Sequence, residues 1–130
     1  MNVLVVDDSK IIRDRLVNLL SGIKGVETVA QAENAKIAMS TYRTIRPEVL
    51  ILDIRMRGVN GIELLKQIKN EQHASKVIML TNFPYPQYKK KCIEVGADYF
   101  LDKSSEFDQV GEIIRNLVEQ SGHVIHTNYE

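Results

Sequence analysis

The chain has 130 residues, 44% of them hydrophobic and 26% charged, a balance typical of one folded domain rather than a disordered or fibrous chain. Its 17 Lys and Arg residues equal its 17 Asp and Glu residues, which argues against a general nucleic-acid or membrane footprint. No segment resembles a signal peptide or approaches the roughly 18 apolar residues that span a bilayer, and the single Cys92 excludes an internal disulfide. We therefore expect a cytoplasmic protein.

Short aliphatic runs alternate with longer stretches of helical periodicity along the whole chain. This alternation predicts βαβ units around a parallel sheet. The predicted strands are residues 2–6, 26–31, 48–52, 76–80 and 98–101. Three of them are almost purely aliphatic, as expected for strands that are covered on both faces.

The first two predicted helices have recognisable ends. Ser9 is a candidate N-cap for the first, and Gly22 follows its last turn. Its apolar stripe is Ile12, Leu16, Leu19 and Leu20. The second helix is predicted to start at Asn34 and to stop before Pro47. Its inward side chains are expected to be Ile37, Ala38, Thr41, Tyr42 and Ile45.

The remaining predicted helices follow the third, fourth and fifth strands. Asn60 with Glu63 resembles a capping box for the third, which buries Leu64, Leu65 and Ile68. The fourth starts no earlier than Pro86 and ends at Gly96, and Cys92 on it is interpreted as a small buried side chain. The fifth starts near Ser105 and buries Val110, Ile113, Ile114, Leu117 and Val118.

Residues 122–130 show no helical stripe, so we expect a domain over residues 1–121 followed by a flexible C-terminal tail. His123 and His126 in this tail are too few ligands to indicate a metal site.

Acidic residues follow two of the aliphatic runs, and a lysine follows a third. Asp7 and Asp8 end the first run, Asp53 ends the middle one, and Lys103 comes after the last. Because the carboxyl ends of parallel strands share one edge of a sheet, these side chains are expected to converge. Three clustered carboxylates need a compensating positive charge, and an oxygen-only site favours Mg²⁺, with Mn²⁺ as a substitute. Taken alone, Asp8 could simply cap a helix.

A carboxylate beside a divalent cation can accept a phosphoryl group. Asp53 stands alone at the end of its run and is the better acceptor, while Asp7 and Asp8 hold the metal. Thr81 could place its hydroxyl on a phosphoryl oxygen, or could serve only local turn chemistry. Lys103 could balance the new charge, or could be an ordinary surface lysine.

Four short motifs now carry a resemblance to a known family. In chain order they are Asp7-Asp8, Leu52-Asp53, Leu80-Thr81 and Leu101-Asp102-Lys103. This ordered set resembles the receiver domain of bacterial two-component response regulators. The resemblance implies a flavodoxin-like (βα)5 fold, that is, a doubly wound α/β domain whose parallel five-stranded sheet has the order 2-1-3-4-5.

The resemblance also implies a function. A histidine kinase or phosphotransfer protein would transfer a phosphoryl group to Asp53, and the domain would catalyse only its own phosphorylation and dephosphorylation. The implied metal ligands are Asp7, Asp8, Asp53 and the main-chain carbonyl of Arg55. Thr81 and Lys103 would contact the phosphoryl group. Thr81 and Phe100 would form the switch, although Phe100 could equally be plain core packing.

The switched surface would be the fourth helix, fifth strand and fifth helix. It would serve a downstream protein, an output domain of the same chain or a phosphorylation-dependent homodimer, with no direct binding of nucleic acid or membrane. Pro84, Pro86 and the Lys89-Lys90-Lys91 run fall on this surface, which suggests specialisation for a particular partner, although such a charge run is usually just solvated.

Two positions depart from the family pattern. Arg57 replaces the usual proline four residues after Asp53, and Asn82 replaces a small residue after Thr81. These departures leave open a scaffold that works without phosphorylation. A phosphatase with an aspartate nucleophile is a weaker alternative, because Arg55 stands where its second carboxylate would be.

Overall fold

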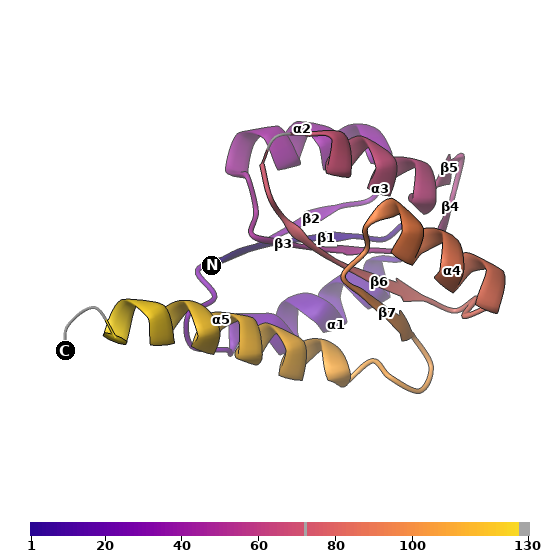
Figure 1. Ribbon diagram of the computed structural model, residues 1–130. Helices are drawn as coiled ribbons and strands as arrows, with labels where there is room; N and C mark the ends of the chain where they lie inside the picture. Colours follow the sequence, from indigo (N-terminus) through magenta and orange to yellow (C-terminus); the bar gives the residue numbers. More distant parts are fainter. Residues whose placement is uncertain (72, 128–130) are drawn as a thin grey trace.

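The computed structural model describes the backbone of residues 1–71 and 73–127, and side chains up to residue 121 apart from residue 72. Five parallel strands form its main sheet (Figure 1). They are β1 (Asn2–Val6), β2 (Thr28–Ala32), β3 (Val49–Leu52), β6 (Lys76–Thr81) and β7 (Tyr99–Asp102). Their spatial order is β2-β1-β3-β6-β7, which is the predicted 2-1-3-4-5 order and confirms the flavodoxin-like fold.

Helices cover both faces of this sheet. They are α1 (Lys10–Ser21), α2 (Ala35–Ile45), α3 (Gly61–Asn70), α4 (Pro86–Val95) and α5 (Gln109–Thr127). Figure 1 shows α1 and α5 on one face and α2, α3 and α4 on the other. The core is divided in the same way, because Val3 and Val5 of β1 pack toward α1 and α5 while Leu4 and Val6 pack toward α2 and α3. Alternate residues of one strand thus serve two cores.

The predicted N-caps are confirmed. The side chains of Ser9, Asn34 and Asn60 accept hydrogen bonds from backbone N–H groups in the first turns of α1, α2 and α3. Helix α4 begins at Pro86 as predicted, and Gly96 ends it in the left-handed conformation at φ 119°. Glu63 does not complete a capping box, because its carboxylate pairs with Lys66 at 3.1 Å.

Some sequence expectations were wrong in detail. Ile37 was expected to face inward but is 38% exposed. A short antiparallel hairpin, β4 (Arg55–Met56) and β5 (Val59–Asn60), fills the connection before α3 and was not predicted. Its turn contains Gly58 at φ 68°, a conformation that glycine adopts easily.

Helix α5 differs from its prediction at both ends. It begins at Gln109 rather than near Ser105, because the preceding residues form hydrogen-bonded turns such as that between the N–H of Glu106 and the carbonyl of Asp102. Its backbone is helical to Thr127, past residue 121, where no regular helix was expected. A helix that is already nucleated extends readily into weaker sequence, which explains this difference. None of the described helices is long and apolar enough to cross a membrane.

Candidate functional site

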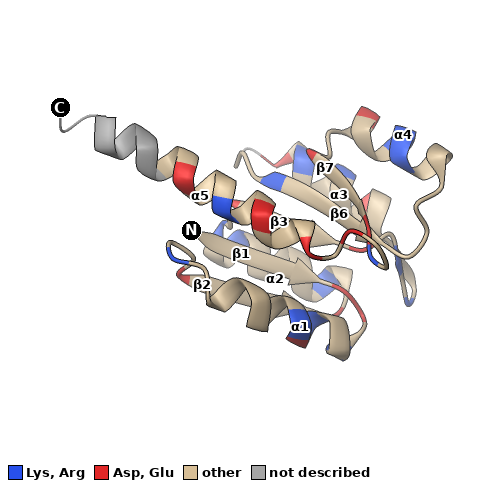
Figure 2. Ribbon diagram, turned by 90° about the horizontal axis from the view of Figure 1, so that it is seen from below, with Lys and Arg blue, Asp and Glu red and all other residues tan. Residues whose placement is uncertain are grey.

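The carboxyl edge of the sheet brings the two central acidic positions together. Val6 of β1 lies opposite Leu52 of β3, so the residues that follow them, Asp7 and Asp53, leave adjacent strands side by side. Each still belongs to the backbone ladder, since the N–H of Asp53 donates to Val6 at 3.2 Å and that of Asp7 donates to Ala32 at 3.1 Å. The loop carrying Asp7 and Asp8 follows the tip of the β1 arrow in Figure 2.

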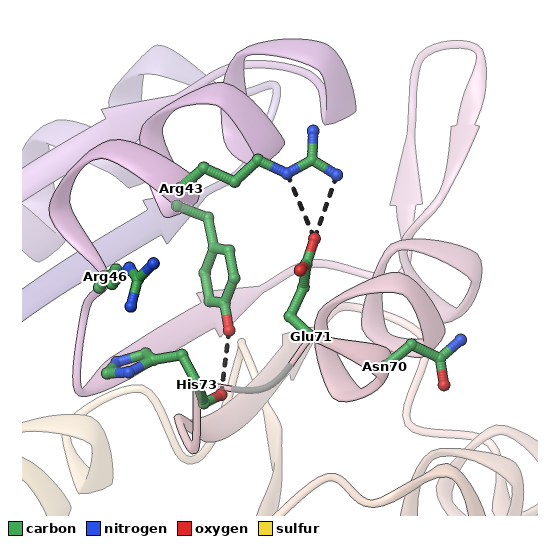
Figure 3. Close-up of a pocket in the computed structure, with 6 residues that line it drawn as sticks. Arg43, Arg46, Asn70, Glu71 and His73 are labelled. Atoms are coloured by element: carbon green, nitrogen blue, oxygen red, sulfur yellow. Dashed lines mark hydrogen bonds and ion pairs between the residues drawn. The ribbon is translucent and has the colours of Figure 1, made fainter.

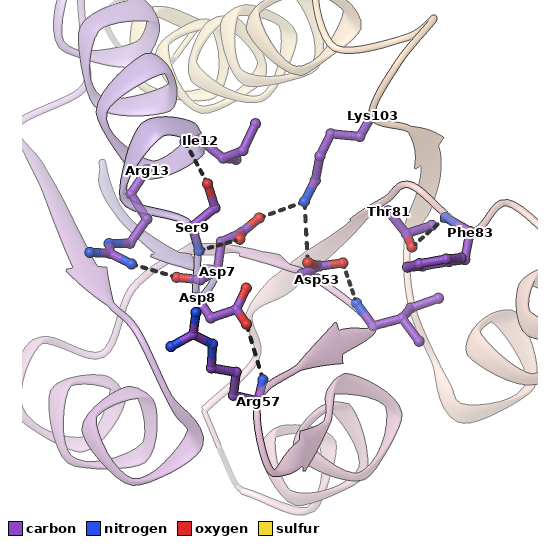
Figure 4. Close-up of polar contacts among 11 residues, drawn as sticks. Asp7, Asp8, Ser9, Ile12, Arg13, Asp53, Arg57, Thr81, Phe83 and Lys103 are labelled. Carbon is purple, nitrogen blue, oxygen red and sulfur yellow. Dashed lines mark hydrogen bonds and ion pairs between the residues drawn. The ribbon is translucent and has the colours of Figure 1, made fainter.

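Lys103 reaches this pair from the segment after β7. Its Nζ lies 2.7 Å from Oδ2 of Asp7 and 3.2 Å from Oδ2 of Asp53 (Figure 4). All three residues are buried, at 7%, 3% and 6% exposure respectively. Lys103 is therefore not a solvated surface lysine, and one ammonium group is shared by two carboxylates.

Backbone N–H groups hold the remaining carboxylate oxygens. Asp7 Oδ1 accepts from the N–H of Ser9 at 2.9 Å, and Asp53 Oδ1 accepts from the N–H of Ile54 at 2.8 Å. Asp8 is the most open of the three acids, and its Oδ2 accepts from the N–H of Arg57 at 3.1 Å. These bonds fix the direction of each carboxylate before any ligand arrives.

Burial and the attraction between Lys103 and the carboxylates shift the pKa values of this cluster in opposite directions. Burial raises the pKa of Asp53 above its usual range, the charge of Lys103 opposes that shift, and the charge of Asp7 adds to it. For Lys103, burial alone would lower the pKa, but the hydrogen bond to Asp7 and the charges of Asp53 and Asp7 outweigh burial and raise it. The ammonium group therefore stays charged while the cluster retains excess negative charge.

The three aspartates can present ligand oxygens to one cation. One oxygen from each of Asp7, Asp8 and Asp53 lies within 4.8 Å of the others. An all-oxygen set with excess negative charge fits a hard divalent ion that keeps several waters, such as Mg²⁺. Arg55, whose carbonyl is a further predicted ligand, lies on β4 just after Asp53.

The two expected switch residues lie on the neighbouring strands β6 and β7. Thr81 ends β6 and is completely buried, and its Oγ1 accepts from the N–H of Phe83 at 3.0 Å. Phe100 on β7 lies opposite Met79 of β6 and is half-buried against the core under α3 and α4. Asp102 turns away from the cluster, since its Oδ1 accepts from the N–H and the hydroxyl of Ser104.

A family model described as the response regulator receiver domain matches residues 3–122. The chain belongs to this family. It is 26% identical over 117 residues to the response regulator GacA of Pseudomonas aeruginosa, covering 90% of this chain and 55% of that protein. It is also 37% identical over 108 residues to a protein-glutamate methylesterase/protein-glutamine glutaminase of Desulfotalea psychrophila, covering 82% of this chain and 30% of that one. The receiver domain thus spans about half or less of these curated relatives.

Solved structures agree with this assignment. A LuxR-family two-component response regulator from Aurantimonas sp. has a TM-score of 0.82 at 26% identity, over 92% of this chain and 85% of that chain. The response regulator domain of Thermotoga maritima CheB has a TM-score of 0.78 at 28% identity, over 92% of this chain and 94% of that chain.

Some residues of the receiver domain that shape its site were missed by sequence reasoning. A Cβ at Gly61 would clash with the carbonyl oxygen of Asp53, so α3 can approach the loop after β3 this closely only with glycine. Arg13 donates to the carbonyl of Asp7 at 2.8 Å. The Asn60-Gly61 pair at a helix start was a usable signal for the first, whereas nothing local in the sequence indicated the second.

A hollow in the receiver domain lies near the amino end of β6, away from the aspartates. It is lined by Tyr42, Arg43, Arg46, Asn70, Glu71 and His73 (Figure 3). Arg43 donates from Nε and Nη2 to Glu71 Oε1 at 3.2 and 3.1 Å, and the Tyr42 hydroxyl donates to the His73 carbonyl at 3.1 Å. These hydrogen bonds link α2 to the segment that follows α3, which indicates a structural role for this part of the hollow.

Proposed function

We propose that this receiver domain accepts a phosphoryl group on Asp53, with Mg²⁺ bound, and that phosphorylation changes the surface of α4, β7 and α5. The observation that carries the proposal is the contact of the Lys103 ammonium with both Asp7 and Asp53. A lysine shared between two carboxylates leaves one negative charge uncompensated beside a third acid. That arrangement suits a site whose charge changes when it works.

The chemistry follows from the roles of individual atoms. A carboxylate oxygen of Asp53 attacks phosphorus in line, forming a P–O bond while the bond from phosphorus to the donor breaks and the donor atom keeps the electron pair. Ile54 orients the attacking carboxylate through its N–H. Lys103, already 3.2 Å from Asp53, stays beside the phosphoryl oxygens and offsets their charge. Thr81 supplies a hydroxyl donor from the next strand.

Asp7, Asp8, Asp53 and the carbonyl of Arg55 would hold the cation. When bound, Mg²⁺ supplies charge neutralisation for the incoming phosphoryl oxygens. The separation of the three carboxylates supports this assignment, since their oxygens lie within 4.8 Å of one another.

The donor and the output follow from the family. We propose a histidine kinase or phosphotransfer protein as donor, and as receiver of the signal a downstream protein, an output domain or a second copy of the chain. One solved relative is described as a DNA-binding response regulator of the LuxR family from Staphylococcus aureus. The exposed Lys89-Lys90-Lys91 run of α4 lies on the proposed output surface (Figure 2). We further propose that the functional unit ends near residue 121.

Titration with beryllofluoride and Mg²⁺, followed by NMR, tests this function. Beryllofluoride imitates the aspartyl phosphate, so amide signals near Asp53, Thr81 and Phe100 are expected to shift only when Mg²⁺ is present. The matched control is Asp53→Asn, which keeps the shape of the side chain and removes the acceptor charge. A response that persists in that variant, or no response in the natural protein, would leave a phosphorylation-independent scaffold as the function.

A further inference from the structure

The side chain of Arg55 makes contacts that the proposed phosphotransfer does not use. Its guanidinium carbon lies 4.0 Å from the ring centroid of Phe83 and 5.7 Å from that of Tyr88, and its Nη2 donates to the Tyr88 hydroxyl at 2.9 Å. Arg55 belongs to the hairpin after Asp53, Phe83 precedes α4, and Tyr88 lies within α4. One arginine thus ties together the two loops that follow β3 and β6.

The same cluster continues to the site through the backbone. The guanidinium group of Arg55 stacks on the ring of Phe83. The backbone N–H of Phe83 in turn donates to Oγ1 of Thr81 at 3.0 Å (Figure 4). The ring of Tyr85 contacts both other rings, at centroid distances of 6.1 Å from Phe83 and 5.6 Å from Tyr88. The hydroxyl of Thr81 is therefore held by a residue whose ring is itself held by Arg55.

We propose that Arg55 is a positioning residue, which acts through Phe83 to hold the Thr81 hydroxyl in its present direction and so opposes its movement toward a phosphoryl group on Asp53. This inference rests on the proposed function. We name Arg55, Phe83 and Tyr88 the aromatic clasp. The Thr81 hydroxyl can approach Asp53 in two ways. Either its hydrogen bond to the Phe83 N–H breaks, or the Phe83 backbone moves with it. The second movement shifts the Phe83 ring relative to Arg55.

The positive charge of Arg55 could also act simply by attracting the phosphoryl group, and the chain offers a control for that effect. Arg57 lies on the same hairpin and is exposed, and its backbone N–H rather than its side chain donates to Asp8. Arg57→Ala therefore removes the same charge while keeping the clasp. Every variant keeps the main-chain carbonyl at position 55, which is the proposed metal ligand.

The first measurement uses the protein without any phosphoryl mimic. Solvent exchange of the Phe83 N–H, measured by NMR, is expected to rise roughly threefold or more in Arg55→Ala, the effect of losing one exposed cation–π contact. Arg57→Ala should leave it unchanged, and Arg55→Lys, which keeps a cation over the ring, should give an intermediate rate. Equal exchange rates in Arg55→Ala and the natural protein would overturn the clasp.

The second measurement is the affinity for beryllofluoride with saturating Mg²⁺. Both alanine variants lose one positive charge, so the ratio of their beryllofluoride affinities reports the effect of the aromatic clasp alone. Arg55→Ala should bind roughly threefold more tightly than Arg57→Ala. Equal or weaker binding would overturn the opposition to Thr81. If the natural protein gives no beryllofluoride response, the proposed function fails by itself, and the exchange rates alone decide whether the clasp holds Thr81.

Discussion

The Nζ of Lys103 lies closer to Asp7 than to Asp53, at 2.7 Å against 3.2 Å, although both carboxylates are buried. The lysine therefore pairs first with Asp7, a proposed metal ligand, and secondarily with Asp53, the proposed acceptor. This difference leaves Asp53 as the less neutralised of the two acids.

Removing the lysine should destabilise the protein in a cation-dependent way. Lys103→Met leaves buried carboxylates without a partner, and unfolding in urea at neutral pH should show a loss of about 3–5 kcal/mol. Added Mg²⁺ should restore much of this loss, because it replaces the missing charge. The control is Lys66→Met, which removes an exposed partner of Glu63 and should cost under about 1 kcal/mol. Equal stability of Lys103→Met and the natural protein would contradict the shared-ammonium description.

The direction of the Asp53 pKa shift sets the sign of its contribution to the pH dependence of stability. Burial, partly offset by Lys103, raises its pKa in the folded protein above 3.8, so the folded state favours the protonated form. The contribution of Asp53 to stability is therefore greatest below that value and is lost as the pH rises through the folded pKa. Asp53→Asn should be more stable than the natural protein at pH 7 without Mg²⁺, with the advantage shrinking toward pH 3.8. An advantage that grows on acidification would show that the pKa is lowered instead.

Cys92 should be unreactive in the folded protein. Its side chain is fully buried, and burial raises the pKa of the thiol from 9.0 to about 11. Alkylation by iodoacetamide at pH 8 should follow the fraction of unfolded protein as urea is added. The buried thiol also stabilises the fold fully below pH 9.0 and loses that contribution as the pH rises toward 11. Rapid labelling without urea would indicate local opening around α4.

Gly61 should tolerate no side chain. Gly61→Ala forces α3 away from the carbonyl of Asp53, and we expect a loss of about 1–3 kcal/mol in urea unfolding together with weaker beryllofluoride binding. Gly22→Ala is the matched control, because nothing lies within 4 Å of a Cβ there. A stable Gly61→Ala variant that binds beryllofluoride normally would mean that the loop relaxes without affecting the site.

Arg46 at the end of α2 has a left-handed backbone, at φ 45°, which disfavours side chains with a Cβ. Arg46→Gly should raise the melting temperature, with a gain of about 1 kcal/mol, whereas Arg46→Ala should not. If glycine and alanine behave alike, the arginine side chain contributes more to this corner than the backbone strain costs.

The parallel sheet and the meeting of Asp7, Asp8, Asp53 and Lys103 could be predicted because each depends on a local pattern, whereas the strand order was implied only by the resemblance to receiver domains. Aliphatic runs that end in Asp7, Asp53 and Lys103 need only parallel pairing to bring those side chains to one edge. The hairpin of β4 and β5 could not be predicted from the sequence, because two-residue strands are too short to show an alternating pattern. The exposure of Ile37 could not be predicted either. Periodicity identifies the apolar face of a helix, but it does not show how much of that face the sheet covers.

The aromatic clasp could not be predicted from sequence either. Arg55 is far in the chain from Phe83 and Tyr88, and stacking between Arg55 and Phe83 depends on rotamers that only the folded loops determine. The sequence indicated that the entry to α4 was unusual, through Pro84 and Pro86, but not what the aromatic residues around those prolines contact.

The backbone amides of Asp7 and Asp53 and the carbonyl of Thr81 all belong to the backbone ladder at this edge of the sheet, whereas the Thr81 hydroxyl is bonded to a loop residue beyond β6. Breaking these backbone hydrogen bonds requires unfolding of the central sheet, whereas rearranging the loop that contains Phe83 does not. The backbone that carries the two carboxylates is thus expected to persist until the whole domain unfolds, whereas the Thr81 hydroxyl can exchange its partner within an intact native state.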